Sequence, residues 1–283
     1  MKAKNNILSL GLGAAVLFWA GAASADNITV FDTLDPKGIG KGYEDNEVEI
    51  NCEQGQKWDL EAFLFDLNTK KLAIQGGFDF KNGVSDWRPL TYYSGDIFID
   101  VDGNFKWPNQ LAGSGTGGYA TELNSKFGWD YAIAFERKTG YGNEGGPLTG
   151  NYTVYQLSGA TDVLVYFGAN YESNPFRYLS GGSVPVTSAP TSGSVSQWED
   201  NPAGASGGTH YVLGNIDLSF LQSDPNYEVG KEIYFHYTYG CGNDVIMGKT
   251  YGWSIADGGF TVALLGFSLS ALGFASRRLG RTR

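Results

Sequence analysis

The fold class is decided by a stretch that contains WDLEAFLFD at 58–66, LNTK at 67–70 and KLAIQGGFDF at 71–80. Apolar and aromatic residues recur in both outer segments without a helical period, which predicts two β-strands. Between them, Asn68 and Thr69 form a short polar turn, so the two strands are expected to pair as a hairpin. This stretch therefore predicts an antiparallel sheet.

The same pattern of short aromatic or alternating segments continues along the chain. The 41 Gly, 17 Tyr and 17 Phe, with only 18% charged residues, are typical of β-sheet proteins. The predicted strands are Glu47–Asn51, Trp58–Asp66, Lys71–Phe80, Asp96–Val101, Tyr131–Arg137, Tyr152–Leu157, Asp162–Phe167, His210–Asp217 and Glu232–Tyr239. We therefore predict one all-β domain over residues 26–254, built as an antiparallel β-sandwich or jelly roll, with two small β domains as the alternative.

Turn-rich segments separate these strands. Segments dense in Gly, Ser, Thr, Pro and Asn predict long loops at 106–118, 138–150 and 180–209. Asp102-Gly103-Asn104 predicts a second hairpin turn, and a short helix is expected at Leu218–Leu221. The domain is thus expected to contain little helix.

The N-terminus has the pattern of a secretory signal peptide. Two lysines in the first four residues precede the apolar run Ile7–Ala23, and small residues at Ala23 and Ala25 fit the positions that a signal peptidase recognises. Residues 1–25 are therefore predicted to be removed, which makes Asp26 the first residue of the mature chain. An uncleaved anchor or a buried helix is the alternative for the same apolar run.

The C-terminus carries three features in order. The short motif consists of Ile255, Ala256, Asp257, Gly258 and Gly259, the apolar run is Phe260–Ala275, and the basic end at 277–283 contains Arg277, Arg278, Arg281 and Arg283. A helix over the run would rise about 24 Å, which approaches a hydrocarbon core of roughly 30 Å. Arginines stay on the cytoplasmic side, so the residues before the transmembrane helix are predicted to lie outside. The alternative is a buried core helix.

This tail, over 255–283, resembles the sorting tail of the bacterial PEP-CTERM class of exported proteins. Its motif is similar to the Val-Pro-Asp-Gly-Gly and Val-Pro-Asp-Ser-Gly variants, except that Ala256 replaces the proline. The resemblance implies cleavage near Asp257–Gly259 by an exosortase, a membrane transpeptidase. It also implies transfer of the ectodomain to an envelope acceptor in organisms that make exopolysaccharide. The expected locations are an inner-membrane precursor and then the cell surface or extracellular matrix.

The two cysteines, Cys52 and Cys241, would lie in an oxidising compartment after export. One pairing is available, and a bond would close a loop of about 190 residues worth very roughly 5 kcal/mol in the chain-entropy model. We therefore predict a disulfide between them. A pair of buried thiols is the alternative.

The charge of the mature chain argues against nucleic acid as a partner. Removal of the basic residues of both ends leaves 14 Lys and Arg against 30 Asp and Glu, a net charge near −16. Binding to the phosphate backbone depends on basic side chains, which are scarce here. The acidic excess is expected to keep an exported protein soluble.

Catalytic motifs are absent from the sequence, and we assign no catalytic residue, cofactor or resident metal. His210 and His236 alternate with apolar residues, which favours packing or a hydrogen bond. Asp130 and Glu136 form a weak candidate for a glycosidase pair. Four tryptophans in or near loops could stack on sugar rings, although core packing explains them equally well: Trp87, Trp107, Trp129 and Trp198.

The segment Asp100-Val101-Asp102-Gly103-Asn104 resembles the opening of a calcium loop. An EF-hand loop needs Gly at its sixth position and Glu at its twelfth, whereas Phe105 and Leu111 occupy these positions. A tight turn is the better explanation, and a calcium site completed by distant ligands stays open.

Two function classes follow from these observations. The first is a non-catalytic envelope or matrix protein sorted through its tail, with a link to exopolysaccharide that rests on the resemblance alone. The alternative is an ectodomain that binds or cleaves carbohydrate.

Overall fold

A computed structural model of the chain describes residues 25–31, 53, 55–87, 90–106, 118–167, 173–187, 189–200 and 208–254. Within these ranges the chain forms 17 strands and four short 3₁₀ helices, and no helix in them is long and apolar enough to cross a membrane. All of the sheets are antiparallel, which confirms the all-β class. The predicted signal peptide and the whole predicted tail at 255–283 lie outside the described residues.

The strands are short, and their bounds are β1 Asp26–Asn27, β2 Thr29–Phe31, β3 Leu60–Asp66, β4 Lys71–Gly76, β5 Val84–Ser85, β6 Thr91–Tyr92, β7 Ile97–Asp100, β8 Tyr119–Leu123, β9 Tyr131–Arg137, β10 Leu148–Gln156, β11 Asp162–Tyr166, β12 Arg177–Ser180, β13 Ser192–Ser194, β14 Ser196–Glu199, β15 Tyr211–Asp217, β16 Glu232–Thr238 and β17 Val245–Tyr251. The 3₁₀ helices are η1 Gln56–Trp58, η2 Asn124–Lys126, η3 Gly142–Glu144 and η4 Ser219–Ser223.

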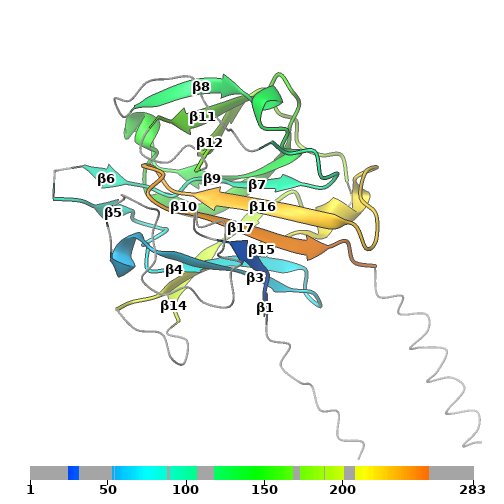
Figure 1. Cartoon of the computed structure of the whole chain (residues 1–283), viewed down its shortest axis with the longest axis horizontal. Helices are drawn as coiled ribbons and strands as arrows, with labels where there is room; N and C mark the ends of the chain where they lie inside the picture. Colours follow the sequence, from blue (N-terminus) through cyan, green and yellow to red (C-terminus); the bar gives the residue numbers. More distant parts are fainter. Residues whose placement is uncertain are drawn as a thin grey trace, which may run out of the picture.

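The sheets are arranged in layers (Figure 1). A seven-stranded sheet in the order β13-β10-β9-β7-β16-β17-β2 occupies the middle. A five-stranded sheet, β1-β3-β4-β15-β14, covers one face of it, and a three-stranded sheet, β12-β11-β8, covers the other. A small hairpin of β5 and β6 completes the described sheets.

Each face of the central sheet contributes to a separate hydrophobic core. Along β16, Ile233, Phe235 and Tyr237 pack into the core shared with the five-stranded sheet. Tyr234, which points the other way, packs against the second core beneath the three-stranded sheet. Because successive side chains of a strand point to opposite faces, a strand covered on both sides must carry apolar residues at consecutive positions.

The hairpin predicted at the start is present. Strands β3 and β4 pair around residues 67–70, with Asp66 opposite Lys71. The Asp66 carboxylate accepts hydrogen bonds from the backbone N–H of Asn68 and the hydroxyl of Thr69. This side chain therefore fixes the polar turn that the sequence indicates.

Two local predictions are wrong. The Asp102-Gly103-Asn104 turn closes no hairpin, because β7 pairs with β9 and β16 while the next strand, β8, belongs to another sheet. Segment 180–209, predicted as one loop, contains β13 and β14, which pair at the edges of two sheets. The predicted strand Glu47–Asn51 lies outside the described residues.

The two ends of the domain lie side by side. Strand β1 pairs with β3 of the five-stranded sheet, and β2 pairs with β17 of the central sheet. Ile28, between them, donates its N–H to Phe63 and accepts a hydrogen bond from Lys249 N–H. The first strands thus join two layers at one edge.

Asp96 connects the central sheet to the three-stranded sheet. Its side chain is 1% exposed, and one oxygen accepts from the N–H of Phe135 at 3.0 Å and from the guanidinium of Arg137 at 2.6 Å. The other oxygen accepts from the N–H of Tyr178 at 3.0 Å. A single carboxylate therefore holds segments from β9 and β12 beside β7.

We expect Asp96→Ala to lower the free energy of unfolding by about 3–5 kcal/mol, because it leaves the buried Arg137 guanidinium without its counter-charge. Chemical denaturation measures the change. The matched control is Glu232→Ala, which removes an exposed ion pair with Lys249 and should lower the free energy of unfolding far less than Asp96→Ala does. Equal losses in the two variants would contradict the role of Asp96.

Candidate functional site

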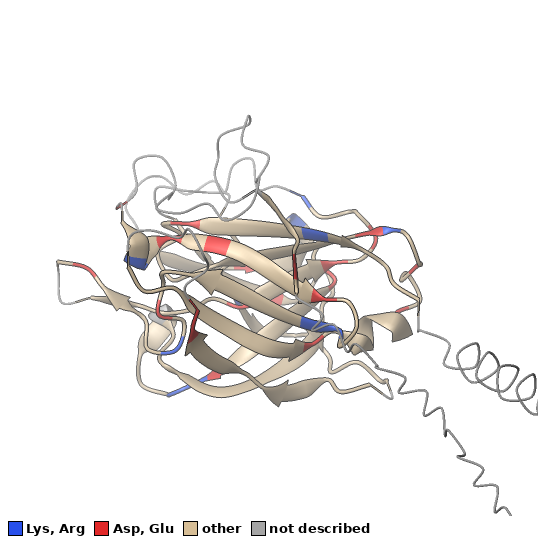
Figure 2. Cartoon of the chain, turned by 90° about the horizontal axis from the view of Figure 1, so that it is seen from below, with Lys and Arg blue, Asp and Glu red and all other residues tan. Residues whose placement is uncertain are grey.

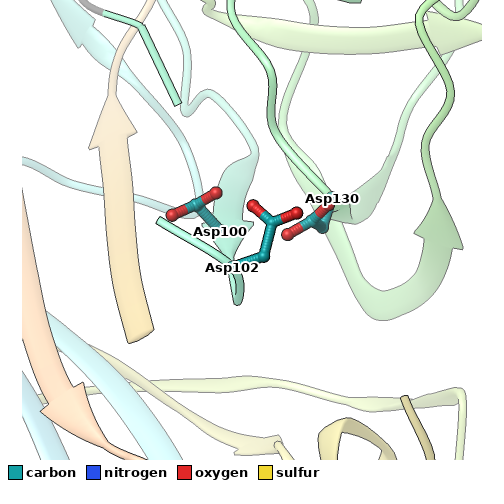
Figure 3. A group of neighbouring side chains, drawn as sticks. All are labelled: Asp100, Asp102 and Asp130. Atoms are coloured by element: carbon teal, nitrogen blue, oxygen red, sulfur yellow. The ribbon is translucent and has the colours of Figure 1, made fainter. Parts of the chain in front are cut away.

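Three carboxylates meet where β7 ends and β9 begins (Figure 3). Asp100 is the last residue of β7, Asp102 follows in the turn, and Asp130 directly precedes β9. Pairing of Ile99 with Tyr131 brings Asp130 beside the turn. Each of the three offers an oxygen, and these oxygens lie within 4.8 Å of one another.

Backbone N–H groups already bind these carboxylates. Asp100, which is fully buried, accepts from Gly103 at 2.9 Å and from Asn104 at 3.2 Å. The exposed Asp102 accepts from the backbone and side-chain nitrogens of Asn104. Asp130 accepts from the N–H of Val101 at 2.8 Å. The turn is therefore stabilised by its own acidic side chains.

Burial and mutual repulsion both disfavour the charged forms. Burial, followed by the charge of Asp130, raises the pKa of Asp100 to about 7. Burial also raises the pKa of Asp130 to about 6, with further contributions from the charges of Asp102 and Asp224. At neutral pH Asp100 is therefore only about half ionised, while Asp130 is mostly ionised.

Chemically, such a cluster is a candidate cation site. Calcium takes six to eight oxygen ligands, so three carboxylates would supply only part of its shell. The sequence analysis left open a calcium site in which residues distant in sequence complete the ligands of Asp100 and Asp102. Asp130 is a candidate for such a residue. The candidate rests on the carboxylates alone, and no ion is assigned to it.

We expect the domain to lose stability as the pH rises from 5 to 8, because raised pKa values favour the protonated native state and this advantage disappears as the native groups ionise. Asp102→Asn removes one repelling charge, so its loss should be smaller by on the order of 1 kcal/mol. Thermal or denaturant unfolding at both pH values measures this difference. Equal losses in the wild type and the variant would show that Asp102 does not repel its neighbours.

Both histidines are buried and hydrogen-bonded. His210 pairs through Nδ1 with the carboxylate of Glu61, and His236 Nε2 lies 3.1 Å from the carbonyl oxygen of Pro175. Burial lowers the pKa of His236 to about 4, so this ring is neutral at physiological pH. These positions agree with the packing interpretation of the sequence.

The weak glycosidase candidate does not assemble. Asp130 and Glu136 are six residues apart along an extended strand, a span of about 20 Å, whereas such a pair needs at most about 9.5 Å. Glu136 is exposed and accepts from Thr149 and Asn151.

The four tryptophans have different environments. Trp129 is buried in the second core, while Trp87 and Trp198 are exposed. Trp107 lies outside the described residues.

The surroundings of Cys241 bear on the predicted disulfide, although Cys52 lies outside the described residues. Asn243 binds the backbone of Glu53 twice at 2.8 Å, through its oxygen to the N–H and through its nitrogen to the carbonyl. Consecutive Cα atoms are about 3.8 Å apart, so this contact draws the chain next to residue 52 toward the segment of Cys241. The disulfide itself stays a prediction.

We expect Cys52 and Cys241 to resist thiol labelling in the native and in the unreduced, denatured protein, because a disulfide consumes both thiols. Mass spectrometry of an unreduced digest should contain the linked peptides. The double variant Cys52→Ser, Cys241→Ser should lose about 2–5 kcal/mol of stability. Two labelled cysteines after denaturation without reductant would exclude the bond.

Sequence reasoning missed a second polar group, in which the side chains of Gln56, Glu61 and His210 contact one another. Glu61 lies inside an aromatic strand, and neither its acidity nor its spacing singled it out.

No protein-family model matches this chain, and no curated protein or solved structure matches it either.

Proposed function

We propose that this chain is exported, folds outside the inner membrane, and serves as a non-catalytic envelope or matrix protein. In this proposal residues 1–25 are a signal peptide, and 255–283 is a sorting tail similar to PEP-CTERM tails. An exosortase-like transpeptidase is the processing partner. Exopolysaccharide as a further partner, and the cell surface or matrix as the destination, rest on that resemblance.

The observation that carries the proposal is the agreement between the folded domain and the predicted processing points. Strand β1 begins at Asp26, the residue expected to become the N-terminus. At the other end, Trp253 is 5% exposed and packs against Phe65 with 4.9 Å between ring centroids. Its carbonyl oxygen accepts the hydroxyl hydrogen of Tyr227 at 2.6 Å. Packed residues of the described chain thus lie directly beside the two predicted cleavage regions.

The layered architecture fits a domain that stays folded after its two flanking segments are removed. We infer that the five-stranded and seven-stranded sheets form a β-sandwich, because both contribute side chains to one core. Strand β2, near the start of the described domain, pairs with β17, near its end. Removal of the flanking segments would leave this strand pairing intact.

We expect deletion of Phe260–Arg283 to release a folded domain whose N-terminus is Asp26, because this proposal treats the tail as a sorting signal and not as part of the core. Replacement of Asp257, Gly258 and Gly259 by Ala should leave an uncut, membrane-bound precursor. Cell fractionation, intact mass and N-terminal sequencing distinguish these outcomes in a host that contains an exosortase.

The matched control is Arg281→Lys with Arg283→Lys, which keeps the basic charge and should leave processing unchanged. Misfolding or cytoplasmic retention of the deleted form would contradict the assignment of the tail. Recovery of Met1 on the exported protein would contradict signal-peptide cleavage.

A further inference from the structure

Two guanidinium groups share one carboxylate where β12 begins beside the β9–β10 connection. The charge of Arg137 acts on Arg177, and Asp96 is the one acidic side chain that forms an ion pair with either of them within the described residues. Asp96 binds Arg137 at 2.6 Å, and its other oxygen accepts from the N–H of Tyr178. These three charged side chains therefore carry one positive charge in excess.

Arg177 has few partners of its own. Its Nη1 donates to the carbonyl oxygen of Asn143 over a long 3.3 Å, and its guanidinium carbon lies 5.9 Å from the ring centroid of Phe176. Its Nε is buried and has no acceptor in the described chain. Its Nη2 donates to no described residue either, but this nitrogen is accessible to solvent. The two N–H groups of Nη2 are therefore available to an acceptor from outside the protein.

The electrostatic surroundings of Arg177 favour a negatively charged acceptor. Burial, followed by the charge of Arg137, lowers the pKa of Arg177 to about 10, so the guanidinium keeps its charge at neutral pH. A bound anion would offset both of these unfavourable effects on the cation. Hydrogen bonds between charged partners are also stronger than those to neutral acceptors. A carboxylate therefore fits this nitrogen better than a hydroxyl does.

Two glycines let the side chains of Arg177 and Tyr141 lie against the same stretch of backbone. A Cβ on Gly145 would lie 3.4 Å from Arg177 Nη1, and a Cβ on Gly146 would lie 2.8 Å from Tyr141 Cδ2. Gly145 has a φ of 106°, which other residues rarely adopt. Tyr141 is 42% exposed and packs edge-on against Tyr93, with 5.3 Å between ring centroids. An exposed aromatic ring thus lies beside the available donor.

The charge of the whole domain limits the size of the anion. Acidic residues outnumber basic ones over the described chain (Figure 2). This field repels a polyanion, whereas a small ligand with one negative charge meets mainly the local excess at Arg177. The exposed ring of Tyr141 adds an apolar surface against which the body of a cyclic ligand packs.

We infer that Arg177 and Tyr141 form a binding site for a small sugar acid, with its carboxylate on Nη2 of Arg177 and its ring against Tyr141. Asp96 does not compete for this position, because Arg137 and Tyr178 already bind its two oxygens. This inference goes beyond the proposed sorting function and does not depend on cleavage of the tail.

The experiment is calorimetric titration of the full chain with methyl glucuronide, in a detergent without a sugar head group. Methyl glucuronide should bind, and the neutral methyl glucoside should bind at least about ten-fold more weakly because it lacks the charge. Acetate, which lacks the ring, should also bind more weakly than methyl glucuronide. An increase in salt from about 0.05 M to about 0.5 M should weaken binding of methyl glucuronide.

Variants separate the two parts of the site. Arg177→Gln should weaken binding of methyl glucuronide by at least about ten-fold, and Tyr141→Leu, at an exposed position, by about two- to ten-fold. The matched control is Lys126→Gln, which also removes one positive charge, from an exposed ion pair with Glu122. This control should bind as the wild type does. The unfolding midpoint of each variant shows that it is folded at the temperature of the titration.

No binding of methyl glucuronide at about 20 mM (roughly the weakest useful affinity) would overturn the inference. Equal binding of methyl glucoside, equal weakening by Lys126→Gln, or tighter binding of trigalacturonate would also overturn it. Binding that appears only in the variant Glu144→Gln would do the same, because Glu144 would then be the counter-charge of Arg177. Failure here with normal secretion would leave the sorting proposal intact.

Discussion

Because the side chain of Asp96 is almost inaccessible to solvent, its charge must be balanced inside the protein, and the groups that balance it come from different layers. Arg137 belongs to β9, and Tyr178 belongs to β12 of the three-stranded sheet. Arg137 also donates to the carbonyl oxygens of Ser94 and Gly95, which precede the carboxylate in sequence. Hydrophobic burial alone would allow several relative positions of two packed sheets, because it is not directional. The hydrogen bonds of Asp96 and Arg137 are directional, so they favour one of these positions.

The central sheet explains which parts of the fold could be predicted from sequence. Strands such as β9 and β16 are buried on both faces, so their dense apolar and aromatic runs stand out, and β9 occurs at the predicted residues. Strands β13 and β14 are short, consist mostly of Ser and other small or polar residues, and lie at sheet edges. An edge strand of this kind buries few side chains, and so its composition resembles that of a loop.

The polar groups were harder to predict for a different reason. Asp100 and Asp102 drew attention as a local pattern, but their contact with Asp130 depends on the register between β7 and β9. Glu61 and His210 are separated by 149 positions and meet because β3 and β15 both pair with β4. Sequence spacing carries no information about such pairings, since each needs a strand neighbour that only the folded sheet supplies.

The two polar groups differ in how completely hydrogen bonds within the protein satisfy them. In the carboxylate cluster, backbone N–H groups of the turn and of Val101 bind the acids, so the turn itself accounts for their position. In the second group, Glu61 and His210 fix the nitrogen of the Gln56 amide, while its buried oxygen has no hydrogen-bond donor among the described residues. A buried acceptor without a donor costs about 1–3 kcal/mol, so the bonds that Gln56 does make, together with the burial of its neighbours, have to offset that cost.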